Sequence, residues 1–213
     1  MNKELYYTLL TDGTSDKALL PILTWLLQQH LGTYTIHADR AELERLPRPP
    51  KTLTDKIERC VALYSCDILF IHRDAEKQPL NMRQAEIEIA FKQVRKKLGK
   101  SALPKIVCVI PVRMTEAWLL FDEAAIRKAA GNPMGCQKLN IPQITKVEKL
   151  PDPKKMLYEL LKKASGLSGR RLGKFNVHER VHRVANFIED FSELRQLPAF
   201  QVLEDEIKTL CEW

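Results

Sequence analysis

At 213 residues the chain is long enough for one sizeable core with a small appendage, since domains usually run to about 100–200 residues. Its composition, 45% hydrophobic and 29% charged, is that of an ordinary soluble globular protein. The net charge of +7 suits a polyanionic partner without demanding one.

The cysteines and the apolar runs indicate the cellular compartment in which the protein is expected. The five cysteines are odd in number and widely spaced with no C-x-x-C pair, which indicates free thiols in a reducing compartment. The longest apolar stretch, 18–27, contains Pro21 and falls short of the roughly 20 residues that span a bilayer. No cleavable leader pattern precedes it. We therefore expect a cytoplasmic protein without a membrane segment.

The stretch 5–16, LYYTLLTDGTSD, is an apolar run that breaks into a turn with two carboxylates. The run predicts a strand buried on both faces of a sheet. Asp12 stands where that strand ends, and Gly13 permits a tight turn. Thr14 or Ser15 can cap a helix, whose first turn contains Asp16.

Helices and strands then alternate as far as residue 122. Leucines at helical spacing predict a helix over 15–31, with Pro21 tolerated near its start. A short strand is expected at 33–37, a basic Pro-rich loop at 45–51 and a helix at 52–64. Buried strands at 66–71 and 106–112 flank a helix at 82–98, and a helical run follows at 115–122. This alternation predicts parallel βαβ units.

The second part of the chain is helical. Residues 131–152 are irregular and contain several prolines. An amphipathic helix is expected at 154–163, a flexible basic loop at 166–174, and further helices at 177–188 and 200–210. We therefore predict an α/β core over 1–130, with a mostly parallel sheet flanked by helices, and a linker and helical C-terminal extension over 131–213 that packs on the core.

Acids follow all three apolar strands. They are Asp12 and Asp16 after the first, Asp74 and Glu76 after the second, and Glu116 and Asp122 after the third. Acids at one edge of a parallel sheet repel each other unless a cation neutralises them, and oxygen ligands select Mg²⁺ or Mn²⁺. Such a site suits hydrolysis or transfer of phosphoryl groups. The alternative for any single acid, Asp16 above all, is a helix cap.

The motifs T-D-G-T-S-D, R-D-A-E and T-E-A-W-L-L-F-D, each after a strand, resemble those of the Toprim domain, and specifically of the Toprim-like proteins of unknown function in bacterial defence islands. Toprim domains are compact, Rossmann-like α/β units that hold Mg²⁺ on a first-strand Glu and a later D-x-D pair. They occur in primases, topoisomerases and the nucleases of the overcoming-lysogenization-defect group. The resemblance covers about residues 5–122, with a weaker echo around 178–200.

The resemblance implies a set of metal ligands with two departures from the family. Asp12 takes the place of the family Glu and is one methylene shorter, while Asp74 and Glu76 take the place of D-x-D, so that Glu76 changes the reach. Glu116, in the E-A-W motif, is implied as an extra ligand or a base. Trp118 is expected to be core packing rather than a base-stacking residue. The resemblance also implies a partner ATPase of the ABC type and a role in anti-phage defence.

A competing motif is H-E-R-V-H, formed by His178, Glu179 and His182, which matches the H-E-x-x-H pattern of zinc proteases. The third ligand would be Glu189, Asp190 or Glu204. Arg180 occupies a position that such a helix normally buries, and the extended metzincin pattern fails at Ala185 and Asn186. Surface histidines and phosphate contacts are the other interpretations.

Basic residues near the acids are candidates for contacts with a nucleic-acid backbone. They are Arg73, the run from Arg95 to Lys97, Arg113, Arg170, Arg171, Lys174 and His178. His72 is interpreted as a satisfied core residue or a ligand. The sequence therefore predicts a divalent-metal-dependent nuclease in which Asp12, Asp74 and Glu76 hold Mg²⁺ or Mn²⁺ and Glu116 holds a second ion or orients water. The substrate, DNA or RNA, and homo-oligomerisation stay open. The alternative is a non-catalytic nucleic-acid or partner-binding module.

Overall fold

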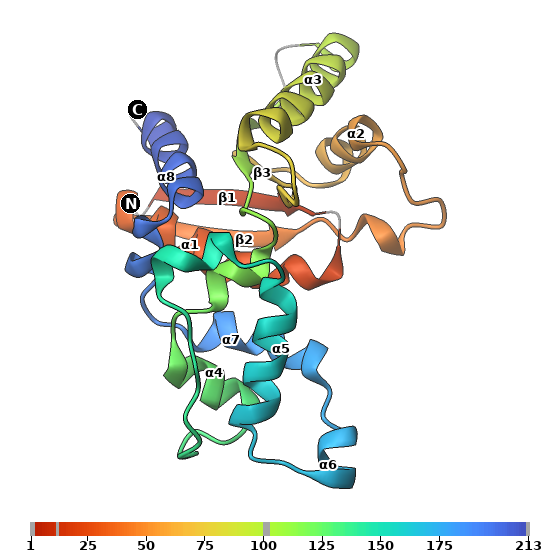
Figure 1. The fold of residues 1–213 in the computed structure, drawn as a ribbon. Helices are drawn as coiled ribbons and strands as arrows, with labels where there is room; N and C mark the ends of the chain where they lie inside the picture. Colours follow the sequence, from red (N-terminus) through yellow and green to blue (C-terminus); the bar gives the residue numbers. More distant parts are fainter. Residues whose placement is uncertain (1–2, 12, 100–102, 212–213) are drawn as a thin grey trace. The chain divides into compact units, whose positions relative to one another are not determined.

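The fold contains a four-stranded parallel sheet (Figure 1). The computed structural model describes residues 3–11, 13–99 and 103–211. Its strands are β1 (Lys3–Leu10), β2 (Tyr34–Arg40), β3 (Ile68–His72) and β4 (Lys105–Val109), in the order β2-β1-β3-β4. All three strand pairings are parallel, so the predicted α/β class with a parallel sheet flanked by helices is confirmed.

The contacts divide the chain into two compact units. Unit 1 comprises Met1–Asp12, Leu26–Ile110 and Val202–Trp213, and it contains the sheet. Unit 2 comprises Gly13–Trp25 and Pro111–Gln201 and, in its described residues, consists of helices and loops. Two of the unit boundaries fall inside helices, α1 (Leu19–His30) and α8 (Pro198–Cys211).

The burial pattern of each strand follows its place in the sheet. All five residues of β3 are buried, as the apolar run predicts for a central strand. β1 is buried from Tyr7 onwards and pairs with β3 from Tyr7↔Ile68 to Leu10↔Ile71. β2 is an edge strand whose residues before Arg40 are exposed or half-buried, and it continues to Arg40, three residues beyond its predicted end.

Helices α2 (Leu53–Leu63) and α3 (Leu80–Leu98) cover one face of the sheet in unit 1. Ile57 of α2 and Ile87 of α3 are fully buried in one cluster with Leu69 and Ile71 of β3. The side chain of Thr52 accepts the N–H of Asp55 and so caps α2 where the sequence predicts its start. A single turn, η2 (Leu43–Arg45), precedes the Pro-rich loop.

The helix predicted over 15–31 consists of two parts. A 3-10 helix, η1 (Thr14–Ala18), precedes α1, so that Pro21 falls in the first turn of α1, where its missing N–H costs no hydrogen bond. The N-cap of η1 is Gly13 rather than Thr14 or Ser15. The strand predicted to end at residue 112 ends at Val109, before Pro111.

Unit 2 is built from short helices. They are η3 (Thr115–Leu119), α4 (Glu123–Ala130), η4 (Ile144–Lys149), α5 (Pro153–Ala164), α6 (Gly169–Gly173), α7 (Val177–Phe187) and η5 (Ser192–Gln196). Its core includes Trp118, fully buried edge-on to Phe200 with ring centroids 5.3 Å apart, which confirms the core interpretation. The prediction of a loop over 166–174 was wrong in part, because Gly169–Gly173 form α6.

No helix among the described residues has both the length and the apolar character that a bilayer crossing requires.

Candidate functional site

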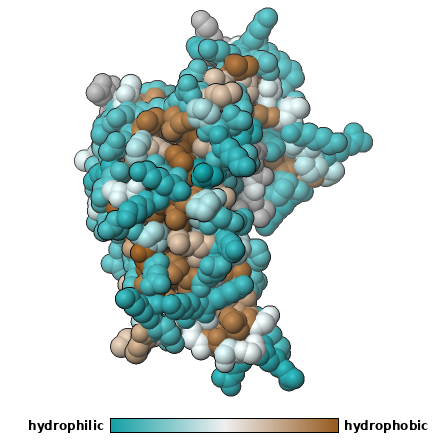
Figure 2. Space-filling model, in the orientation of Figure 1, coloured by the Kyte–Doolittle hydropathy of each residue, from teal (hydrophilic) through white to brown (hydrophobic). Residues whose placement is uncertain are grey.

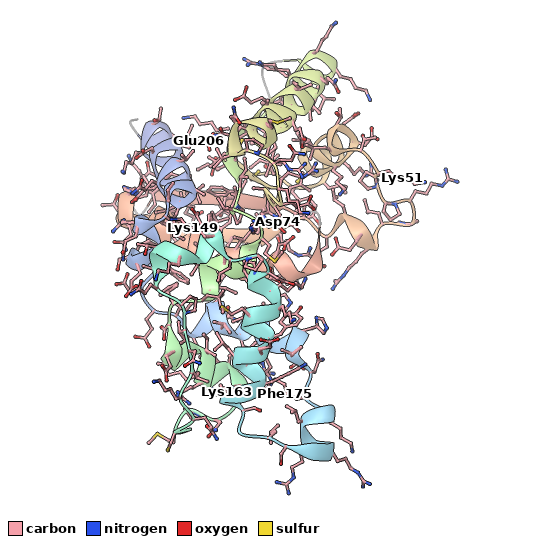
Figure 3. The ribbon with its side chains drawn as sticks, in the orientation of Figure 1. Lys51, Asp74, Lys149, Lys163, Phe175 and Glu206 are labelled. Carbon is pink, nitrogen blue, oxygen red and sulfur yellow. The ribbon has the colours of Figure 1, made fainter. Side chains whose placement is uncertain are left out.

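The end of β3 presents an oriented carboxylate in unit 1. Asp74 stands two residues beyond the strand, and its side chain is 33% exposed (Figure 3). His72, the last residue of β3, is buried at 2% and donates Nε2–H to Oδ1 of Asp74 at 3.1 Å. A buried imidazole bonded to a carboxylate fixes its direction, which metal ligands and catalytic acids both need. His72 is thus the satisfied core residue that was one of the two interpretations of the sequence, with a polar role as well.

Glu76 lies two residues further on and faces a guanidinium. Its side chain is 71% exposed, and its carboxylate is 3.2 Å from Nη2 of Arg83 on α3. Arg83 also donates from Nη1 to Glu86 at 2.9 Å, so that two carboxylates share one cation. In the described residues Glu76 therefore belongs to a surface ion-pair network, which is weaker evidence for a metal ligand than the buried contact of Asp74.

Two residues after strands have left-handed backbones. Glu76 has φ 53° and Arg113 has φ 63°, and they are the only residues other than glycine with positive φ in the described parts of the chain. Such a conformation costs a residue with a Cβ about 1–2 kcal/mol, and strain of this kind gathers at functional sites. Glu76 follows β3 in unit 1, and Arg113 follows β4 and opens unit 2.

Unit 2 buries two of the predicted acids. Asp16 of η1 is 6% exposed and accepts the N–H of Gly13 at Oδ2, at 3.2 Å, which is the capping role left open by the sequence. Glu116 of η3 is 5% exposed, and Nζ of Lys154 lies 3.5 Å from its Oε1. A carboxylate removed from water needs such a partner.

The charge of Lys154 depends on these acids. Burial alone would lower the pKa of Lys154, but the Glu116 carboxylate, together with Tyr158 and Asp16, raises it above its ordinary value of 10.5. For Tyr158, burial raises the pKa of the hydroxyl above 10.0. Glu116 raises this pKa further, whereas Lys154 lowers it. The lysine is therefore a cation and the tyrosine a neutral phenol at neutral pH.

Tyr158 connects Glu116 and Lys154 to α7. Its hydroxyl and Nδ1 of His178 share a hydrogen bond of 2.9 Å, and the two rings meet edge to face at 5.1 Å. Lys154 and Tyr158 are four residues apart on α5, so they share one helix face. We name these five side chains the unit 2 polar cluster: Asp16, Glu116, Lys154, Tyr158 and His178. Lys154 and Tyr158 were missed by sequence reasoning, although their spacing on an amphipathic helix was visible.

The predicted acids thus lie in two groups, Asp74 and Glu76 in unit 1 and Asp16 and Glu116 in unit 2. Asp12 lies outside the described residues. Among the described residues, no three His, Cys, Asp or Glu side chains gather in a group that could hold a metal ion. Asp122 is not part of a site, because its carboxylate accepts the N–H of Ala125 and caps α4. The convergence of all the acids at one edge stays a prediction.

The H-E-x-x-H motif lies on a helix, α7, as its spacing requires. His178 bonds to Tyr158, and Oε1 of Glu179 is 2.6 Å from Arg183 in an exposed ion pair. The proposed third ligands are engaged elsewhere in two cases, since Asp190 accepts from Ser192 and Glu204 bonds to His30. The described contacts give the zinc-protease interpretation no support.

The predicted phosphate contacts differ in their surroundings. Arg73 lies 3.8 Å from Glu86, and its side chain is 25% exposed. Arg113 is half-buried and has the strained backbone described above. Arg170, Arg171 and Lys174 are exposed in and beside α6.

Comparison of the chain with models of protein families, with curated proteins and with solved structures finds no match.

Proposed function

We propose that the chain is a divalent-metal-dependent nuclease that hydrolyses phosphodiester bonds of DNA or RNA, with a Toprim-like core and a role in anti-phage defence. One observation carries the proposal. β1 and β3 are parallel neighbours in register from Tyr7↔Ile68 to Leu10↔Ile71, so the segments that follow them leave the same edge of the sheet. Asp74, held by buried His72, stands at that edge.

The acids that the sequence assigns to this edge have the chemistry that a hard cation prefers. Asp12 and Asp74 would supply carboxylate oxygens, the ligands that Mg²⁺ and Mn²⁺ prefer, with Glu76 as a further acid once released from Arg83. When bound, the ion would lower the pKa of a water and offset the charge that develops on the phosphate. His72 keeps Asp74 directed, and Arg73 offers a guanidinium to a phosphate oxygen.

The test replaces Asp74 by asparagine, which keeps the Oδ1 acceptor for His72 and removes the charge. The purified chain is incubated with plasmid DNA and with RNA in Mn²⁺. We expect cutting to fall about a hundredfold or more, because a metal ligand supplies several kcal/mol to the transition state. Calorimetric titration with Mn²⁺ should show weaker binding by the same variant.

Asp205→Asn is the matched control. Asp205 is also in unit 1, 71% exposed and paired with Lys208 on its own helix, so the variant should cut and bind Mn²⁺ like the unaltered chain. Equal cutting by Asp74→Asn and Asp205→Asn at equal thermal stability would reject the proposed site.

A second candidate is a non-catalytic nucleic-acid-binding module. The described residues favour it in one respect, because they hold no group of three metal-binding side chains and Glu76 is paired with Arg83. Binding of nucleic acid in EDTA without cutting in Mn²⁺ would support the module over the enzyme.

A further inference from the structure

The positive charge of the chain is concentrated in unit 2. Unit 2 contains 17 Lys and Arg against 11 Asp and Glu, a net charge of +6, whereas unit 1 contains 17 against 16, a net charge of +1. The excess that the whole sequence shows is therefore almost entirely a property of unit 2.

Within unit 2 the excess gathers in one continuous stretch. Residues 160–178, which we name the basic segment, contain five Lys and Arg and no Asp or Glu. The five cations are all exposed: Lys162, Lys163, Arg170, Arg171 and Lys174. The segment runs from the end of α5 through α6 to the start of α7, and Figure 3 labels Lys163 and Phe175 within it.

The cations of the basic segment have no carboxylate partners within the described residues. Other exposed cations do, such as Lys97 with Glu58 at 2.8 Å and Arg183 with Glu179 at 2.6 Å. A row of like charges without counter-charges costs self-repulsion, which a polyanion would relieve. Each Lys or Arg that meets a phosphate also releases condensed counterions from the nucleic acid.

The base of the segment is anchored, so the charges project from a fixed support. Asn132 donates Nδ2–H to the carbonyl of Ala164 at 2.9 Å, at the end of α5. Gly166 has φ 66°, and a Cβ there would meet Nε2 of Gln137 at 3.0 Å, which ties the turn to the same loop. At the other end, His178 is held by Tyr158.

The chemistry of the segment favours a nucleic-acid backbone over a membrane surface. Its larger apolar side chains, Leu167, Leu172 and Phe175, are half-buried, and the guanidinium of Arg180 lies 5.6 Å from the Phe175 ring centroid. Figure 2 shows hydrophilic side chains projecting around a small hydrophobic patch at the end that carries α6. An interfacial helix would need a long apolar face, and α6 has five residues.

We propose that the basic segment is the docking surface for the phosphate backbone of the nucleic acid, and that it acts without the metal. The inference rests on the proposed function for its partner class. It adds that the backbone is bound by unit 2, through charge and without base readout, so affinity should depend strongly on salt and little on sequence.

The test measures binding in EDTA, where no metal-dependent cutting occurs. Fluorescence anisotropy follows labelled duplex DNA and labelled single-stranded RNA at about 50 to 200 mM salt. The variant carries Arg170→Gln, Arg171→Gln and Lys174→Gln. We expect affinity to fall tenfold or more at the lower salt and the slope of log K against log salt to lose about 2 to 3.

The control carries Arg48→Gln, Lys51→Gln and Lys92→Gln, three exposed cations of unit 1. Both variants lower the formal net charge from +7 to +4, so a difference between them reports position and not total charge. The control should keep its affinity within about twofold, because none of its three cations belongs to the basic segment. All six sites are exposed, so neither variant should lose stability.

The outcomes separate this inference from the proposed function. Equal loss in both variants, or no loss in either, would overturn the docking surface even if the chain cuts nucleic acid. Variant-specific loss without any cutting in Mn²⁺ would keep the docking surface and reject the nuclease. The triple variant at Arg170, Arg171 and Lys174 could instead lose binding to anionic vesicles while its nucleic-acid binding stays unchanged. That result would replace the proposed partner by a membrane surface.

Discussion

At the scale of single residues, Glu116 shows that a predicted metal ligand can instead belong to an ion pair. The sequence offered it as a metal ligand or a base, and in unit 2 its buried carboxylate lies 3.5 Å from Lys154. Because Lys154 has a raised pKa, the pair adds stability below the ordinary lysine pKa of 10.5. That contribution is lost as the pH rises through the higher pKa of the folded state.

We predict that Lys154→Met destabilises the protein by about 1–2 kcal/mol at neutral pH, because it leaves Glu116 with less compensation for its burial. The estimate is modest since the lysine side chain is 42% exposed. Lys155→Met is the control, because Lys155 is 72% exposed and faces exposed Glu159 at 4.0 Å. Urea denaturation measures both, and equal free energies of unfolding would contradict the role given to the pair.

At the scale of elements, α8 protects an edge of the sheet. β4 is an edge strand, and the N–H of its Cys108 donates to Oε2 of Glu206, labelled on α8 in Figure 3, at 3.0 Å. Burial raises the pKa of Glu206 above 4.5, opposed by the Cys108 N–H and increased by Glu88 of α3. The carboxylate thus satisfies a backbone donor that would otherwise invite another strand.

The raised pKa makes the effect of Glu206 depend on pH. A group that binds its proton more tightly when folded favours the folded state at low pH, and this contribution disappears as the pH rises through its folded pKa. We predict that Glu206→Gln, which keeps an oxygen acceptor, is as stable as the unaltered chain or more so at pH 7. This relative advantage should shrink as the pH falls towards 4.5.

Glu206→Ala, which removes the acceptor, should lower the free energy of unfolding by about 1 kcal/mol both at pH 7 and near pH 4.5. Chemical denaturation of the three proteins across the pH range checks both predictions. A difference between the glutamine variant and the unaltered chain that stays constant with pH would show that Glu206 has an ordinary pKa.

The elements also show what the sequence could predict. β1, β3 and β4 were recognisable by their apolar runs, and that of β3, Ile68–Ile71, is buried throughout as a central strand requires. The end of β2 was missed because Asp39 and Arg40 read as loop residues, yet an edge strand tolerates them. Helix α6 was hidden by Gly169 and Gly173, which favour a loop by local propensity.

At the scale of the whole molecule, the division into units could not be read from the chain. Unit 1 takes up three separate segments, and periodicity reports which residues are buried but not against which partner. The candidate site shows the same limit. The acids after each strand were found by their types and places, while the contacts of Asp74 with His72 and of Glu116 with Lys154 arise from tertiary packing.

This organisation makes α8, from Val202 onwards, part of unit 1 together with β1. The segment Val202–Trp213 belongs to unit 1, and Ile207 of α8 is fully buried there. We predict that Ile207→Ala destabilises the protein by about 2–4 kcal/mol through the lost burial and the cavity left behind. Val202→Ala, at a position 40% exposed on the same helix, should cost about 0.5 kcal/mol or less. Thermal and urea unfolding measure both variants, and similar small losses would mean that α8 contributes little to the core of unit 1.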